Sequence, residues 1–98
     1  MKIEFHSRAA AELDEAVDYY NQQVPQLGRE FADEVRAAVA RIQDRPEAWT
    51  LLSDDGIRQC VTHRFPYGII YQVQPQRVVI VAVAHLRRRP GYWRRRVS

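Results

Sequence analysis

Apolar and polar side chains alternate at the start of the chain, where residues 2–6 are KIEFH. This period of two predicts a short, half-buried strand that carries Ile3 and Phe5 on one face. From residue 8 to about residue 22 the apolar positions recur every three or four residues, which predicts a helix with one apolar stripe. Ser7 is expected to cap the start of this helix. The stripe consists of Ala10, Leu13, Val17 and Tyr20, and the outer side carries Glu12, Asp14, Glu15 and Asp18.

A second helix is predicted after a break in the sequence QQVPQLG at residues 22–28. Pro25 disfavours a helical conformation at Val24 and fits the first turn of a new helix. Asp44-Arg45-Pro46 ends that helix. Because the loop is short, the two helices are expected to form an antiparallel hairpin. The apolar side of the second helix consists of Leu27, Phe31, Val35, Ala38, Val39 and Ile42.

The second half of the chain returns to a period of two and predicts three strands, at residues 57–64, 67–73 and 77–85. Phe65-Pro66 is expected to form a bend, and the sequence QPQ at residues 74–76 a tight turn. The connection at residues 47–56 contains Trp49 as an anchor and ends in a turn at residues 54–56.

The third of these strands is apolar on both faces. Strict alternation places Val79, Val81 and Val83 on one face and Val78, Ile80 and Ala82 on the other. This pattern is typical of a strand inside a sheet that is covered on both sides. The sequence therefore predicts an α+β fold of order β-α-α-β-β-β, in which a helical hairpin packs on a small, mainly antiparallel sheet.

Length and composition limit the classes of protein. The 98 residues suit one domain spanning residues 1–98, with an arginine-rich C-terminal segment at residues 85–98. Cys60 stands alone, which excludes an internal disulfide and makes a reducing cytoplasm the simplest compartment. One cysteine and three scattered histidines make no zinc site without carboxylates, so we expect neither metal nor cofactor. The longest apolar run is far shorter than the ~20 residues of a membrane helix. We do not expect MKIEFHSR to act as a signal peptide, because charged residues lie within it and no apolar stretch follows.

Charge is distributed unevenly along the chain. Residues 1–49 carry six basic and ten acidic side chains, whereas residues 50–98 carry nine arginines and two aspartates. The net charge is thus −4 in the first half and +7 in the second, which gives +3 for the whole chain. Such asymmetry suggests that one face binds a polyanion or an acidic protein. Arginine suits this task because its planar guanidinium can pair with carboxylate or phosphate at two points.

The C-terminal sequence HLRRRPGYWRRR, at residues 85–96, gathers six arginines around a Pro-Gly break and two aromatic rings. A purely solvated tail has no need of Trp93. We expect Tyr92 and Trp93 to fold back on the sheet and to fix Arg87–Arg89 in place. For Arg94–Arg96 a solvated run of charge remains a strong alternative.

The sequences FPYGIIYQV, at residues 65–73, and VVIVAVAHLRRRPGYW, at residues 78–93, resemble the RelE/ParE superfamily of bacterial toxins. These proteins are the toxin halves of type II toxin–antitoxin modules. The resemblance covers nearly the whole chain. It implies a toxin that is neutralised in a hetero-oligomer by a cognate antitoxin, whose C-terminal segment wraps the toxin as helix and strand. RelE-like members cut messenger RNA in the ribosome, and ParE-like members inhibit DNA gyrase without nuclease residues.

The residues at the nuclease positions favour the ParE-like branch. Where the resemblance expects lysines, this chain has Gln59 and Val61, and where it expects an arginine after Tyr67 it has Gly68. The late arginine falls on Leu86, one step before Arg87. The tyrosine position is filled by Tyr92.

Two sets of candidate residues follow. A nuclease of different design would use His85, Arg87 and Tyr92, with His63 and Arg64 as weaker candidates, because histidine suits acid–base work near neutral pH. A surface that binds the target or the antitoxin would consist of Arg58, Arg64, Arg87, Arg88, Arg89, Tyr92 and Trp93. A third alternative is a degenerate toxin that binds its antitoxin and little else.

Overall fold

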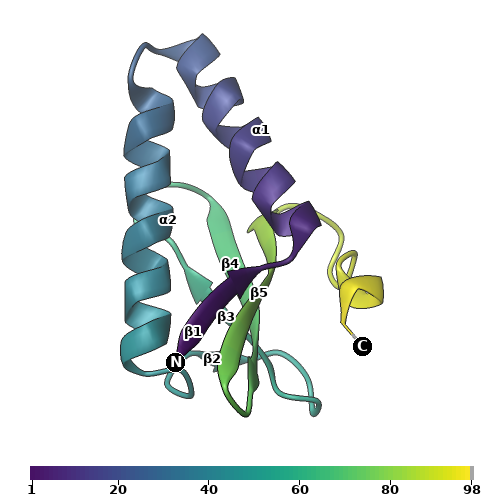
Figure 1. Cartoon of the computed structure of the whole chain (residues 1–98). Coiled ribbons are helices and arrows are strands. Elements are labelled where there is room, and N and C mark those ends of the chain that lie inside the picture. Colours follow the sequence, from purple (N-terminus) through teal and green to yellow (C-terminus); the bar gives the residue numbers. More distant parts are fainter. Residues whose placement is uncertain (98) are drawn as a thin grey trace.

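Two antiparallel helices cover one face of a five-stranded sheet, and the C-terminal segment runs beside the sheet (Figure 1). The computed structural model describes residues 1–97. The elements are β1 (Lys2–Phe5), α1 (Ser7–Gln23), α2 (Leu27–Asp44), β2 (Thr50–Leu51), β3 (Ile57–Val61), β4 (Tyr67–Gln74), β5 (Arg77–His85) and a short 3-10 helix (Arg94–Arg96).

The sheet confirms the predicted α+β class and its mainly antiparallel pairing. Its strand order is β1-β5-β4-β3-β2, in which only β1 and β5 are parallel. β5 therefore lies inside the sheet, as its two apolar faces predict. β2, a two-residue strand that pairs with β3, was not predicted, because Thr50 and Leu51 are too short a run to give a pattern.

The predicted alternation along β5 is wrong beyond its middle, because the pairing with β4 is irregular there. Tyr71 pairs with Ile80 and Ile70 pairs with Ala82, so that Val81 has no opposite residue and forms a bulge. The two faces of β5 exchange at this point. Val78, Ile80 and Val83 belong to the core under the helices, whereas Val81, Ala82 and Ala84 belong to a second cluster with Trp93.

Three predicted boundaries need correction at the residue level. His6, not Ser7, caps α1, since its Nδ1 accepts a hydrogen bond of 3.1 Å from the backbone N–H of Arg8. The residue Pro25 lies in the turn before α2, which begins at Leu27. β3 ends at Val61 rather than at residue 64, because the Thr62 hydroxyl donates to the carbonyl of Phe65 at 2.7 Å and closes a turn.

Candidate functional site

The C-terminal segment is fixed on the sheet by Trp93. This side chain is 5% exposed and packs on the sheet face opposite the helices. Its neighbours in this second cluster are Ile57, Ile70, Val81, Ala82 and Ala84. The expectation that Trp93 folds back on the sheet is confirmed, and the segment around it is not a free tail.

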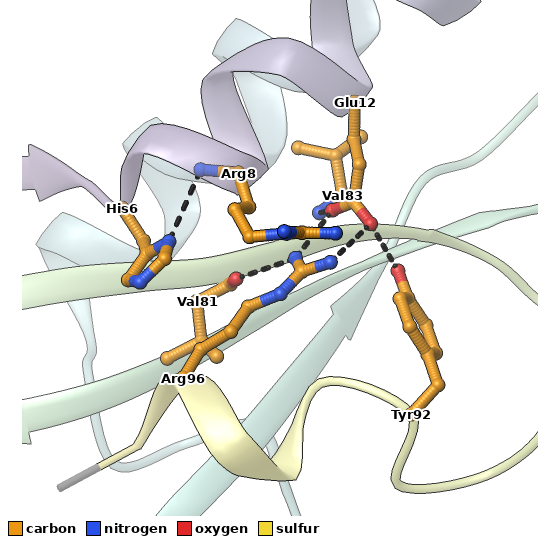
Figure 2. Close-up of polar contacts among 7 residues, drawn as sticks. All are labelled: His6, Arg8, Glu12, Val81, Val83, Tyr92 and Arg96. Atoms are coloured by element: carbon orange, nitrogen blue, oxygen red, sulfur yellow. Dashed lines mark hydrogen bonds and ion pairs between the residues drawn. The ribbon is translucent and has the colours of Figure 1, made fainter.

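Glu12 of α1 holds the same segment by hydrogen bonds (Figure 2). Both carboxylate oxygens accept from the Arg96 guanidinium at 2.9 Å, and Oε2 also accepts from the Tyr92 hydroxyl at 2.7 Å. The side chains of Glu12 and Arg96 are only 14% and 10% exposed. A two-point ion pair that is so shielded from water orients both partners. We refer to Glu12, Tyr92 and Arg96 as the Glu12 clamp.

The Glu12 clamp also completes the hydrogen bonds of a sheet edge. β1 pairs with β5 only as far as Ile80, which leaves the next residues of β5 without a strand on that side. The backbone N–H of Val83 donates to Glu12 Oε1 at 3.0 Å, and the carbonyl of Val81 accepts from Arg96 at 3.1 Å. Since buried backbone groups need partners, these two side chains replace the missing strand.

The clamp changes the acidity of its members. Burial alone would raise the pKa of Glu12, but the hydrogen bonds from Arg96, Tyr92 and Val83 outweigh it and hold the pKa below the usual 4.5. Burial and the hydrogen bond to Glu12 raise the pKa of Tyr92 above its usual 10.0. Tyr92 is therefore a neutral donor at physiological pH, and its proton points at a carboxylate.

The arginines of the segment fall into two groups. Arg94 and Arg96 are ion-paired, Arg94 with Asp55 at 3.2 Å, and the Arg94 guanidinium also lies 4.7 Å from the centre of the Trp93 ring. The second group is exposed and has no carboxylate partner among residues 1–97; it comprises Arg87, Arg88, Arg89 and Arg95. Within it, Arg88 stacks 3.9 Å from the centre of the Tyr92 ring, a cation–π contact that fixes its position.

A groove of about 470 Å³ lies between the C-terminal segment and the sheet, and we call it the C-terminal groove. Its lining combines arginine side chains with apolar residues, among them the exposed Leu52 and Leu86. Its lining includes Leu52, Gln59, Ile70, Ala84, His85, Leu86, Arg88, Arg89, Tyr92, Trp93 and Arg94.

His85 and Tyr92 both line this groove, yet their polar atoms are largely engaged. His85 Nδ1 accepts from the backbone N–H of Arg87 at 3.1 Å, and the His85 ring meets that of Tyr67 edge-on at 5.2 Å. The Tyr92 hydroxyl donates to Glu12. Of the two residues, only the Nε2 nitrogen of His85 remains for contact with a ligand.

Other candidate residues lie outside the C-terminal groove. Arg58 donates to the carbonyl of Trp49 at 2.8 Å, and Arg64 pairs with Glu30 of α2 at 2.7 Å. The side chain of His63 is exposed and does not line the groove, and neither does that of Arg87. The structure thus brings together His85, Arg88, Arg89, Tyr92 and Trp93 from the predicted sets.

Neither a metal site nor a membrane-spanning helix is found in the part of the chain that the structure describes. Within residues 1–97, no three His, Cys, Asp or Glu side chains are grouped so that they could hold a metal ion. None of the helices in this range is long and apolar enough to cross a membrane.

The model of a protein family described as "ParE toxin of type II toxin-antitoxin system, parDE" matches residues 3–90. The chain belongs to the ParE toxin family. A solved structure titled "Chromosomal ParDE TA system from P. aeruginosa" contains a similar fold, with a TM-score of 0.76 and 20% identity over 87% of this chain and 95% of that one. No curated protein matches the sequence. The toxin class that the resemblance implied is thereby confirmed. Trp93 and Arg96 lie beyond residues 3–90, the part that the family model matches.

In this ParE toxin Gln59 and Gly68, which stand where the resemblance leads us to expect a lysine and an arginine, lie against each other. A side chain at Gly68 would begin 2.5 Å from Gln59 Oε1, because the Gln59 side chain lies over the glycine. An arginine at this position therefore has no room unless Gln59 moves. Gln59 itself lines the groove and does not titrate.

Glu12 was expected on the outer side of α1, and this expectation is wrong. The buried residues of the helix are Ala9 and Ala16, and Glu12 lies three residues after the first and four before the second. These spacings place all three on one face of a helix. The sequence of this ParE toxin shows a glutamate three residues after one alanine and four before another, but the burial of these alanines is known only from the structure. The sequence alone therefore does not identify the clamp.

Proposed function

We propose that this ParE-family toxin inhibits DNA gyrase by binding it, through the exposed arginines of the C-terminal segment, and that a cognate antitoxin neutralises it in the cytoplasm. The observation that carries the proposal is the presence of Arg87, Arg88 and Arg89 without carboxylate partners in residues 1–97, next to a buried Trp93. Guanidinium groups on a fixed support suit the recognition of an acidic surface. Arg58 and Arg64 would extend this contact surface.

The residues Gln59 and Val61 of β3 and Gly68 of β4, none of which can transfer a proton, support inhibition by binding over catalysis. RNA cleavage needs a group that removes the proton of the 2′-hydroxyl and another that protonates the leaving oxygen. Gln59 and Gly68 can do neither. Tyr92 is a poor acid because its raised pKa and its bond to Glu12 retain the proton.

An apolar groove of about 460 Å³ on the helical side supports the proposed binding of an antitoxin. It lies among β1, α1 and α2, and its lining includes Phe5, Leu13, Ala32, Val35, Val39 and Ala40. An amphipathic helix binds such a groove through its apolar face, and an added strand can pair with a free sheet edge. The proposed contacts with antitoxin and target therefore use different parts of the surface.

A second candidate function is cleavage of messenger RNA on the ribosome. It is favoured by one observation, the presence of His85 and Tyr92 with arginines in a single groove. In that case His85 would transfer the proton, and Arg87 and Tyr92 would contact the phosphate, with Arg64 and His63 further away as auxiliary groups. The third candidate, a degenerate toxin, would bind only the antitoxin.

Two assays on purified toxin without antitoxin distinguish the three candidate functions. In the first, gyrase supercoils relaxed plasmid in the presence of the toxin; in the second, ribosomes translate a messenger RNA. We expect inhibited supercoiling and intact messenger RNA. Cuts in the RNA that disappear in His85→Ala would overturn the proposal in favour of the nuclease. Activity in neither assay, with tight binding of antitoxin, would leave the degenerate toxin.

A further inference from the structure

We propose that the C-terminal groove binds an acidic peptide segment that carries one bulky apolar side chain. This inference rests on the proposed function, because it names the chemistry of the segment that a protein target would offer to the arginine surface. Two properties of the groove, its charge and its apolar floor, lead to it.

The positive charge at the groove is only partly compensated within residues 1–97. Arg88 and Arg89 stand in its lining, and neither has an ion-pair partner there. Arg94 adds a third guanidinium, which Asp55 only partly neutralises because both side chains are about half exposed. A ligand with carboxylates next to these arginines gains charge-assisted hydrogen bonds at two points each.

The groove also has an apolar part, so we expect its ligand to carry an apolar group as well as charged groups. Leu52 and Leu86 belong to its lining and are 39% and 47% exposed, so both offer apolar surface to a ligand. Ile70 and Ala84 also belong to the lining, although both are largely buried. A volume of about 470 Å³ has room for a leucine or phenylalanine side chain. Burial of such a side chain removes apolar surface of both molecules from water.

The aromatic rings in the groove disfavour single-stranded nucleic acid as the ligand. Binding of single strands depends on exposed aromatic faces on which bases stack. Trp93 is 5% exposed, and one face of the Tyr92 ring is covered by the guanidinium of Arg88 at 3.9 Å. A duplex is bound mainly through its phosphates and gains nothing from Leu52 and Leu86. An acidic peptide with an apolar side chain uses both the arginines and the leucines.

Part of the groove is preorganised. Arg88 stacks on Tyr92, whose hydroxyl is fixed by Glu12. Arginine has many rotamers, and immobilising it on binding costs conformational entropy. Because Tyr92 already restricts Arg88, less of this entropy is lost when a carboxylate binds.

The test measures the affinity of the full chain for three fluorescent probes. They are a glutamate-rich peptide with one central leucine, the same peptide with alanine in place of the leucine, and a single-stranded oligonucleotide of equal net charge. We expect the leucine peptide to bind about fivefold or more tightly than the alanine peptide and more tightly than the oligonucleotide. Equal affinity for the two peptides, or preference for the oligonucleotide, would overturn the proposal.

Double variants, in which two arginines are replaced by glutamates, test whether the peptide binds at the C-terminal groove. Arg88→Glu/Arg89→Glu is expected to weaken binding of the leucine peptide by about tenfold or more. The control, Arg29→Glu/Arg45→Glu, changes the net charge equally at exposed positions of the helical hairpin, away from the C-terminal segment, and is expected to weaken binding by less than about twofold. Leu86→Ser, at an exposed position, tests the apolar contact alone. Equal losses in the two double variants would show that net charge, and not the groove, binds the peptide.

The outcome is independent of gyrase. Peptide binding at the groove without inhibition of supercoiling would remove the proposed target and leave the groove assignment standing. Inhibition of supercoiling without peptide binding would remove the groove assignment alone.

Discussion

At the scale of single residues, Glu12 connects three parts of the chain that are far apart in the sequence. Its carboxylate accepts from Val83 in β5, from Tyr92 and from Arg96. Removing one partner of a shielded ion pair leaves the other charge without compensation, which costs more than the pair itself contributes. The position of the C-terminal segment therefore depends on this carboxylate as well as on Trp93.

Glu12→Gln is expected to lower the free energy of unfolding by about 2–4 kcal/mol, because glutamine keeps the size but leaves the Arg96 charge unpaired. Urea denaturation followed by circular dichroism measures the difference. The control is Glu15→Gln, one turn on and exposed, for which a change within about 0.5 kcal/mol is expected. Similar losses in both variants would contradict the role of the clamp.

The lowered pKa of Glu12 predicts a pH dependence of stability. In the folded state the pKa lies below 4.5, so the unfolded chain binds more protons in this range and stability rises with pH. The contribution of Glu12 is complete above pH 4.5 and is lost as pH falls through the folded pKa. The stability difference between the wild type and Glu12→Gln should therefore be constant near neutral pH and shrink in acid. Glu4, Glu34 and Asp55 also have lowered pKa values, but they are common to both proteins and cancel in the difference.

At the scale of elements, the sequence predicts the helices and the three main strands because each has a clear period. The failures have physical causes in tertiary structure. The bulge at Val81 depends on the register between β4 and β5, which local alternation does not contain. β2 exists because Thr50 and Leu51 happen to lie beside β3. The return of Trp93 to the sheet could be predicted, since a large ring in a run of arginines needs an apolar contact.

Trp93→Ala is expected to lower the free energy of unfolding by about 3–5 kcal/mol, as for other large buried aromatic side chains. It should also release the segment from the sheet, so that limited trypsin digestion cuts faster after Arg94 and Arg95. Tyr19→Ala, at a side chain that is 55% exposed, is the control and should change neither quantity much. Unchanged digestion of Trp93→Ala would mean that the tryptophan does not hold the segment.

At the scale of the whole molecule, the two oppositely charged halves of the sequence are not two oppositely charged faces. Ion pairs link them: Glu4 with Arg77, Glu12 with Arg96 and Glu30 with Arg64. Of the nine arginines in residues 50–98, five have no carboxylate partner within residues 1–97, and four of these five lie in the C-terminal segment: Arg87, Arg88, Arg89 and Arg95. The sequence predicts the excess of positive charge in the second half of the chain, but it does not predict where on the surface this charge lies. Ion pairs between distant residues decide which arginines remain free to bind a partner.

The central claim is tested most directly by measuring the toxin concentration at which supercoiling by gyrase is half inhibited. If exposed arginines on a fixed scaffold cause the inhibition, Arg88→Glu/Arg89→Glu should raise this concentration by about tenfold or more. The control Arg29→Glu/Arg45→Glu, which changes the net charge by the same amount on the helical hairpin, should stay within about twofold of the wild type. The account is contradicted if the wild-type toxin leaves supercoiling unchanged, or if both double variants lose inhibition to the same extent.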